Sequence, residues 1–270
     1  MSVTRAERRR SERTKIKNPE KFQMELELLQ PWSTFVMKTQ LPPQILESMI
    51  KITDKILEDK EPAIRFGDLL AGQIEDEFFI APNILSQEGM IPFFLDMCKN
   101  YIINAYFQQH KEDQEMILKT EWSPKLTSMW IVSQKDNEYN PNHTHADADS
   151  VEMAAISGVM YLKIPEYLPP IKPPNKKNRP VVDGAISFSN NTSQDSIWAA
   201  PSITILPEVG DFFIFPSTQL HQVYPFRTPD GKGERRSVSF NADFTKYVDD
   251  TYIENEEIKK EGQHYISRSK

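Results

Sequence analysis

The chain has 270 residues, of which 39% are hydrophobic, and its formal net charge is −7 at pH 7. This length and apolar content are enough to bury one substantial core, whereas the negative charge argues against general affinity for nucleic acids. No uninterrupted apolar run approaches the roughly 18 residues of a membrane span, and the N-terminus lacks the apolar core of a signal peptide.

The single cysteine, Cys98, cannot form an intramolecular disulfide, and it stands among apolar neighbours such as Phe94 and Ile102. We therefore expect a buried, unreactive thiol. A protein with one cysteine and no membrane span fits the reducing cytoplasm, or the host cytoplasm if the chain comes from a phage.

Three regions follow one another along the chain. Residues 1–20 are basic and almost free of apolar residues. They predict a disordered tail, with a basic arm for nucleic acid or an acidic partner as the alternative. We expect residues 21–248 to form a single domain, with N-terminal helices within 43–115 and a β-rich core at 125–245. An acidic tail then occupies residues 249–270.

The N-terminal half predicts one strand and two helices. Residues 28–40 mix β-branched and aromatic side chains, which favours a strand. Pro43 suits the first turn of a helix, and apolar residues at helical spacing predict an amphipathic helix over 43–60. A second helix is expected over 91–115, and the acidic stretch 69–81 between the helices reads as irregular.

Short strands separated by turn residues dominate the chain after Pro124. The proline-rich segment 165–180 cannot be a helix or a central strand and predicts a surface loop. This pattern is typical of a mainly β domain with flanking helices (α+β), of the antiparallel jelly-roll type. The expected strands are 126–133, 155–164, 185–188, 202–206, 211–215, 220–224 and 236–241.

A candidate metal site lies between Tyr139 and Asp147, where His143, His145 and Asp147 occur within a few residues. In an extended segment, side chains two residues apart point the same way, so His145 can share one ion with either Asp147 or His143. His221, far downstream, could close the site. Two imidazoles and one carboxylate on one face of iron(II) leave positions open for a cosubstrate and dioxygen.

Several motifs occur in the order found in the iron(II)- and 2-oxoglutarate-dependent oxygenases. The chain resembles that superfamily, with its double-stranded β-helix fold, and within it a branch found in tailed phages and marine bacteria. The motifs that carry the resemblance are Asn140-x-His143-x-His145 read loosely, Ser157-Gly-Val-Met-Tyr-Leu162, Gly210-Asp-Phe-Phe-Ile-Phe-Pro-Ser217, Leu220-His-x-Val-x-Pro225 and Glu234-Arg-Arg-Ser-Val-Ser-Phe-Asn241.

The resemblance implies that His221 is the distal iron ligand. It also implies that Arg235 pairs with the distal carboxylate of 2-oxoglutarate and that Ser237 supports the same group. The residue types agree, because a guanidinium matches a carboxylate and residues 235 and 237 share one face of an extended strand. Arg236 falls on the other face with Val238 and Phe240.

The identity of the third iron ligand stays open. The superfamily at large uses His-x-Asp, here His145 and Asp147, whereas the branch tends to show His-x-His, here His143 and His145. Charge favours Asp147, because a carboxylate offsets part of the charge of the ion, and we lean slightly to it.

The implied function is an iron(II)- and 2-oxoglutarate-dependent dioxygenase that hydroxylates its substrate while 2-oxoglutarate is decarboxylated to succinate. 2-Oxoglutarate and dioxygen are then its partners. The sequence does not identify the primary substrate, and a protein side chain such as proline is a guess by analogy. The alternative is a cupin-like jelly roll that binds a metal or ligand without catalysis.

Overall fold

The computed structural model describes residues 34–59, 63–67, 70–109, 120–145, 155–169, 182–190 and 202–248. All of these fall in one compact unit, residues 34–270. Both predicted tails, 1–20 and 249–270, lie outside the described residues. None of the helices in the described part of the chain is long and apolar enough to span a membrane.

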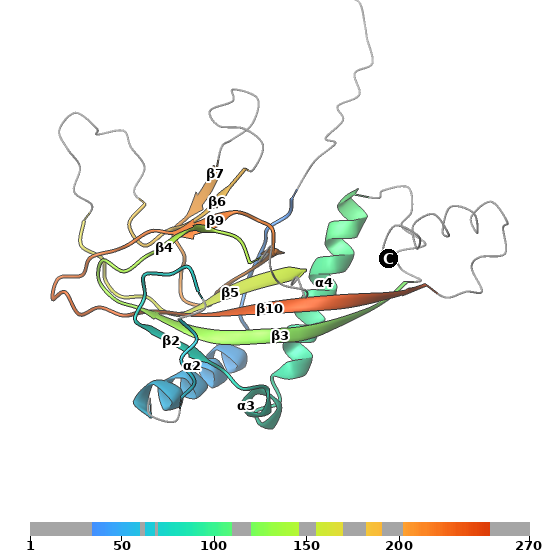
Figure 1. Cartoon of the computed structure of the whole chain (residues 1–270), viewed down its shortest axis with the longest axis horizontal. Coiled ribbons are helices and arrows are strands. Elements are labelled where there is room, and N and C mark those ends of the chain that lie inside the picture. The colour runs from blue at the N-terminus through green and yellow to red at the C-terminus, as the bar shows by residue number, and fades with distance from the viewer. Residues whose placement is uncertain are drawn as a thin grey trace, which may run out of the picture. The chain divides into compact units, whose positions relative to one another are not determined.

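Two antiparallel sheets and three helices make up the described structure (Figure 1). The large sheet has the order β1-β8-β5-β10-β3-β2, and the small sheet has the order β4-β9-β6-β7. The elements are β1 (Met37–Gln40), α2 (Pro43–Glu58), β2 (Asp76–Phe79), α3 (Pro82–Gln87), α4 (Ile91–Gln109), β3 (Thr120–Gln134), β4 (Asn140–His143), β5 (Ile156–Lys163), β6 (Ile186–Ser189), β7 (Ser202–Ile205), β8 (Asp211–Pro216), β9 (His221–Val223) and β10 (Arg235–Val248).

The strand order is that of a double-stranded β-helix, as the sequence predicted. From β3 to β10 the chain passes back and forth between the large and the small sheet, and only β6 and β7 follow each other within one sheet. Figure 1 shows the small sheet on one side of the large sheet, with α2 and α3 on the other. The interior between the sheets is therefore enclosed, which is where a jelly roll can hold a ligand.

Because side chains alternate along each strand, one face of the large sheet packs in the core and the other faces the small sheet. On β10, Val238 and Phe240 join a core that includes Phe94 and Cys98 of α4 and Met49 of α2. The same alternation turns every second residue of β10 toward the space between the sheets. Burial raises the pKa of the Cys98 thiol to about 12, as expected for an unreactive thiol.

The two predicted helices are confirmed as α2 and as α4, which is described to Gln109. The strand predicted over 28–40 is described only from residue 34 and forms β1 at its C-terminal end. The prediction of irregular structure over 69–81 was wrong in part, because residues 76–79 form β2 and α3 follows at once. β2 is a strand because it pairs with β3. The local sequence of an acidic segment does not predict such a pairing.

The strands β3 and β10 are much longer than predicted. They pair along their full length, with a β-bulge between Asn241 and Ala242. The segments 120–125 and 242–248 were not predicted as strands, and this pairing holds them in the sheet. Of the proline-rich segment 165–180, residues 165–169 form neither helix nor strand and the rest lies outside the described residues.

Gly158 of β5 marks the tightest packing of the core against the sheet. A Cβ atom at this position would lie 2.3 Å from the Phe240 ring and 3.0 Å from the Phe213 carbonyl oxygen. We expect Gly158→Ala to lower the free energy of unfolding by about 1–3 kcal/mol, the usual cost of overpacking. Urea denaturation measures the change. Thr127→Ala, at an exposed position of β3, is the matched control, and an equal effect of both variants would contradict the packing argument.

Candidate functional site

Three histidines from two distant segments of the chain meet in the space between the sheets. His143 ends β4 and lies opposite His221, which begins β9, in the antiparallel register of the small sheet. His145 follows two residues later, with its backbone N–H donating to the Ser217 carbonyl over 2.8 Å. Their ligand nitrogens all lie within 4.8 Å of one another, a spacing that one metal ion could bridge.

Hydrogen bonds fix which nitrogen of each ring can bind a metal. His143 Nδ1 lies 2.7 Å from the Pro141 carbonyl oxygen, and His221 Nδ1 lies 2.9 Å from the Gln219 carbonyl oxygen. Because a carbonyl oxygen only accepts, each Nδ1 carries the proton and each Nε2 keeps its lone pair. This is the arrangement that metal-binding imidazoles need.

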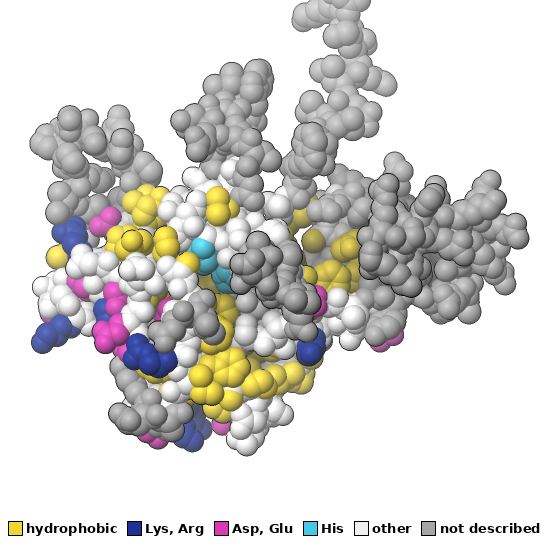
Figure 2. All heavy atoms as spheres, in the orientation of Figure 1, with side chains coloured by type: hydrophobic (Ala, Val, Ile, Leu, Met, Phe, Trp, Pro, Cys, Tyr) yellow, Lys and Arg dark blue, Asp and Glu magenta, His cyan; other side chains and the backbone are white. Residues whose placement is uncertain are grey.

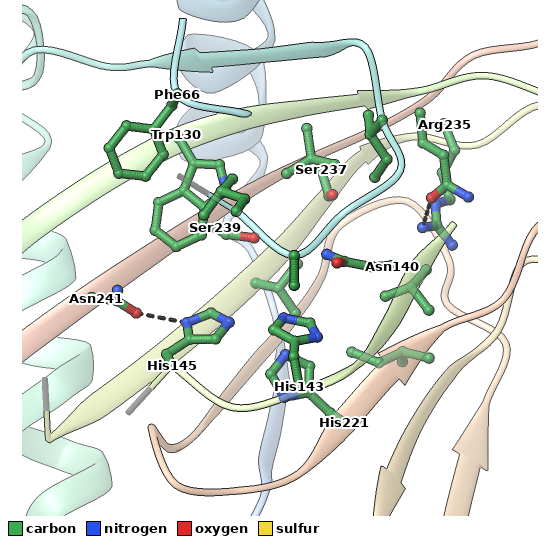
Figure 3. A pocket seen from close by; sticks show the side chains of 18 of the residues that line it. Phe66, Trp130, Asn140, His143, His145, His221, Arg235, Ser237, Ser239 and Asn241 are labelled. Atoms are coloured by element: carbon green, nitrogen blue, oxygen red, sulfur yellow. Dashed lines mark hydrogen bonds between the residues drawn. The ribbon is translucent and has the colours of Figure 1, made fainter. Parts of the chain in front are cut away.

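The His145 ring is oriented by two polar side chains, of which Figure 3 shows Asn241. Its Nδ1 donates to Asn241 Oδ1 over 2.7 Å, and Ser157 Oγ lies 2.9 Å from the same nitrogen. Ser157 also donates to Asn241 Oδ1, over 2.8 Å. The sequence motifs contain Ser157 and Asn241 but gave them no role. The available signal was that Asn241 shares the alternation of Arg235 and Ser237 along β10.

All three imidazoles are held in the neutral form. Burial lowers the pKa of His145 to about 4 and lowers the pKa values of His143 and His221, the latter with help from the two neighbouring rings. A neutral imidazole is the form that binds a metal, so protons do not compete for the site near pH 7.

The donor set fits a divalent transition metal such as iron(II), for which imidazole is a favoured ligand. Among the residues that the structure describes, no carboxylate joins this group. Asp147, the other candidate for the third ligand, lies outside the described residues. The structure thus brings together His143, His145 and His221 and leaves Asp147 as a prediction.

A cavity of about 420 Å³ opens beside the histidines. Among the described residues, histidine occurs only at these three positions, and Figure 2 shows histidine side chains next to hydrophobic ones on the face viewed. The cavity is lined by Phe66, Leu70, Ala71, Ile74, Trp130, Val132, Gln134, Asn140, His143, Thr144, His145, Val159, Tyr161, Ile186, His221, Val223, Arg235, Ser237, Ser239 and Asn241.

Arg235 forms the cationic end of this cavity. Its side chain is only 2% exposed, and it donates to the Gly184 carbonyl oxygen over 2.6 Å and to Gln134 Oε1. The guanidinium also stacks over the Tyr161 ring, 5.5 Å from its centroid. Arg235 is thus fixed in place while its Nε–H stays without a partner.

Unpartnered polar atoms at this end indicate a missing ligand. Arg235 Nε and the hydroxyl oxygen of Tyr161 are buried without a hydrogen-bond partner. A carboxylate accepts from several donors at once, so it would satisfy Arg235 and Tyr161 together. Ser237, which pairs with Tyr161 across β10 and β5, lines the same part of the cavity. The residues present therefore fit the distal carboxylate of 2-oxoglutarate.

Arg236 lies on the opposite face of the sheet, as the alternation of β10 predicted. It pairs with Glu234 over 2.9 Å and with Asp54 of α2, and it donates to Thr53. These contacts attach α2 to the large sheet. Arg236 therefore stabilises the packing of α2 on the sheet, whereas Arg235 faces the cavity.

The opposite end of the cavity is apolar (Figure 3). Phe66 and Trp130 pack with ring centroids 5.2 Å apart, and the Trp130 ring lies 5.7 Å from the His145 ring. Leu70 and Ile74 are further apolar residues that line the cavity. The histidines thus stand between a cationic end and an apolar end of one cavity.

A β-bulge brings Asn140 into the cavity together with His143. The pairing of β4 with β9 shifts register between these two residues, so side chains three positions apart line the same space. Without the bulge, strand alternation would turn one of them away. No local signal in the sequence predicts this.

Glu77 of β2 is a buried carboxylate next to the cavity. It is 1% exposed, and neither carboxylate oxygen has a hydrogen-bond partner. Burial, with a smaller contribution from the charge of Glu138, raises its pKa from 4.5 to about 7. Ionised Glu77 therefore destabilises the folded chain.

The variant Glu77→Gln is expected to be more stable than the natural chain at pH 8, by about 3 kcal/mol at most. The folded-state pKa is raised, so the penalty is absent below pH 4.5, grows as the pH rises to about 7, and stays constant above that. Urea denaturation at pH 5 and pH 8 measures the difference. Glu75→Gln, at an exposed position nearby, is the control, and a stability gain for Glu77→Gln that is equal at both pH values would contradict the assignment.

Comparison with known proteins finds one family whose model matches part of the sequence. Residues 128–241 match the family model described as "Putative 2OG-Fe(II) oxygenase". This region contains all three histidines, Arg235 and Ser237. No curated protein matches the sequence.

Solved structures of similar arrangement share little sequence with the chain. A prolyl-4-hydroxylase from Pseudomonas putida is 14% identical over 77% of this chain and 92% of its own, with a TM-score of 0.42. A viral collagen prolyl hydroxylase from Paramecium Bursaria Chlorella virus-1, in complex with 2-oxoglutarate, is 14% identical over 79% and 96%, with a TM-score of 0.44. The α-ketoglutarate-dependent epimerase SnoN from nogalamycin biosynthesis is 15% identical over 79% and 80%, with a TM-score of 0.46.

The family match covers the strands that carry the histidine cluster and the cationic end of the cavity. Iron(II) and 2-oxoglutarate are accordingly the metal and cosubstrate of this protein, with dioxygen as the second cosubstrate. The narrower branch of phages and marine bacteria stays a prediction. Residues 128–241 match the model of this oxygenase family, and the protein is an iron(II)- and 2-oxoglutarate-dependent dioxygenase.

Proposed function

We propose that this dioxygenase holds iron(II) with His143, His145 and His221 and binds the distal carboxylate of 2-oxoglutarate with Arg235 and Ser237. The observation that carries the proposal is that three neutral imidazoles and a buried guanidinium with free donors share one cavity. Tyr161 adds a hydroxyl to the carboxylate site, because its oxygen is buried beside Arg235 without a partner.

When bound, iron(II) and 2-oxoglutarate supply the oxidation of a C–H bond by dioxygen, with 2-oxoglutarate converted to succinate and carbon dioxide. The chain supplies binding, orientation and the exclusion of water. Gln134 and the Gly184 carbonyl hold Arg235 in place, and Asn241 and Ser157 hold the His145 ring. The apolar wall of Phe66 and Trp130 is where the primary substrate would present its reacting carbon.

The choice between His143 and Asp147 as third ligand can be argued from charge and from position. A carboxylate would offset part of the charge of the ion, which favours Asp147. The orientation of His143 favours this residue instead, because its Nδ1 proton is engaged by Pro141 and its ring stands 4.3 Å from that of His221. We propose His143 as the ligand, and this departs from the slight preference that the sequence gave to Asp147.

The primary substrate and the domain limits remain proposals as well. We propose a hydroxylation target on a protein, with proline as the simplest case, by analogy alone. Residues 21–248 would form the catalytic domain, and the segments 1–20 and 249–270 would be tails.

Anaerobic titration with iron(II) and 2-oxoglutarate tests the whole site. We expect the weak visible charge-transfer band of an iron–2-oxoglutarate complex, followed by succinate formation once air is admitted. Arg235→Gln should weaken 2-oxoglutarate binding by about 100-fold, because charge-assisted hydrogen bonds are lost. Arg227→Gln is the control, since Arg227 pairs with Asp183 outside the cavity. Absence of the band in folded protein would overturn the assignment of the site.

Separate variants of the two candidate ligands distinguish His143 from Asp147. We expect His143→Ala and His221→Ala to weaken iron(II) binding by more than about 100-fold, because residues that only orient metal ligands already cost 10- to 100-fold. Asp147→Asn should change the affinity by less than about 10-fold. Isothermal titration without oxygen measures the affinities. The opposite ranking of His143 and Asp147 would assign the carboxylate to the iron.

A further inference from the structure

The acidic segment Glu75-Asp76-Glu77 contributes nothing to the iron or 2-oxoglutarate sites described above. Glu77 pairs with Val132 in the register of β2 and β3, and Val132 lines the cavity. Directly paired residues of neighbouring strands project from the same face of a sheet. Glu77 therefore lies on the cavity side of the large sheet, at its edge.

No positive charge compensates Glu77 within the part of the chain that the structure describes. Neither of its oxygens accepts a hydrogen bond, and the nearest influence on its charge is a second carboxylate, Glu138. Arg65, the basic residue closest in sequence, donates instead to the Glu75 carbonyl oxygen over 2.6 Å. When ionised, Glu77 thus carries a negative charge that no hydrogen bond of the described residues offsets.

A second unsatisfied acceptor lies between Glu77 and the cavity. Asn140 lines the cavity, and its Oδ1 atom is buried without a partner. A Cβ atom on Gly72 would lie 3.3 Å from Asn140 Oδ1 and 3.5 Å from Glu77 Oε2. Two acceptors therefore approach one point of the chain, and neither is satisfied there.

The segment that separates Glu77 from the cavity is thin. Ala71 and Ile74 line the cavity on either side of Gly72, which has no side chain to add. This segment is attached by the Gln73 N–H, which donates to the Tyr139 carbonyl oxygen, and by the Glu75 N–H, which donates to Glu138. At such a short range and away from bulk water, the Glu77 charge acts strongly on a group in the cavity.

We propose that Asn140 and Glu77 form a subsite for a positively charged group, an alkylammonium or guanidinium, on the primary substrate. Asn140 Oδ1 accepts a hydrogen bond from the cation, and Glu77 behind it supplies the compensating charge. A cation fits better than a neutral donor, because only a cation also relieves the cost of a buried, unpaired carboxylate. The inference rests on the proposed function, since it names the class of substrate for the same cavity.

The position of the subsite also limits the length of the substrate group. Across the β-bulge, Asn140 and His143 lie opposite Val223 and His221, which are two residues apart on β9, a separation of roughly 7 Å along an extended strand. The reacting carbon beside the histidines and the cation beside Asn140 are therefore connected by several bonds. A long basic side chain, or a basic residue close to the hydroxylated one, has this reach.

The test uses the full chain without added iron or 2-oxoglutarate, so its result does not depend on the oxygenase site. n-Butylammonium and 1-butanol, which share one alkyl chain, are titrated at pH 8 while the amide resonances of Gly67 and Gly72 are followed by NMR. Both glycines lie against Glu77. We expect butylammonium to bind at least about 10-fold more tightly than butanol, as a charge-assisted hydrogen bond requires.

The variant Glu77→Gln keeps the shape of the carboxyl group and should weaken butylammonium binding by about 10-fold or more. Glu75→Gln, exposed on the same segment, should change it by less than about twofold. The proposal is overturned if butanol binds as tightly as butylammonium or if Glu77→Gln leaves the affinity unchanged. It is equally overturned if the glycine resonances respond to pH and to neither compound, because Glu77 would then titrate without a ligand.

Discussion

The alternation of side chains along β10 is the constraint on which the rest of the structure depends. Val238 and Phe240 pack against the helices, and Arg235, Ser237 and Asn241 line the cavity. A slip of one residue would exchange these two sets and place the guanidinium in the apolar core. The long pairing of β10 with β3, and its second pairing with β5, prevent such a slip.

Among the described residues, a few buried polar side-chain atoms lack a hydrogen-bond partner, and they indicate where ligands bind. At one end of the cavity they are donors, Arg235 Nε and the Tyr161 hydroxyl, and they suit an anion. Beside β2 they are acceptors, Glu77 and Asn140, and they suit a cation. The cavity therefore has opposite electrostatic preferences at different places, and Asn140 lies between the histidines and Arg235 (Figure 3). Under the two proposals above, this arrangement would orient a cosubstrate and a substrate of opposite charge.

Local patterns were sufficient for much of the fold and for part of the site. Helical periodicity located α2 and α4, and strand alternation separated Arg235 from Arg236. Local patterns did not predict the conformation or position of residues that depend on a distant partner in the chain. β2 was missed because an acidic segment becomes a strand only by pairing with β3, and Asn140 reaches the cavity only through a bulge.

The sequence by itself determined the jelly-roll class, the residue types of a metal and carboxylate site, and the face on which each residue of β10 lies. These follow from periodicity and side-chain chemistry, which act over a few residues. Tertiary structure decided that His143 stands opposite His221, that Gln134 and Tyr161 surround Arg235, and that Glu77 is buried without a partner. Burial and partnership depend on what packs against a residue, and that is set by contacts between segments far apart in the chain.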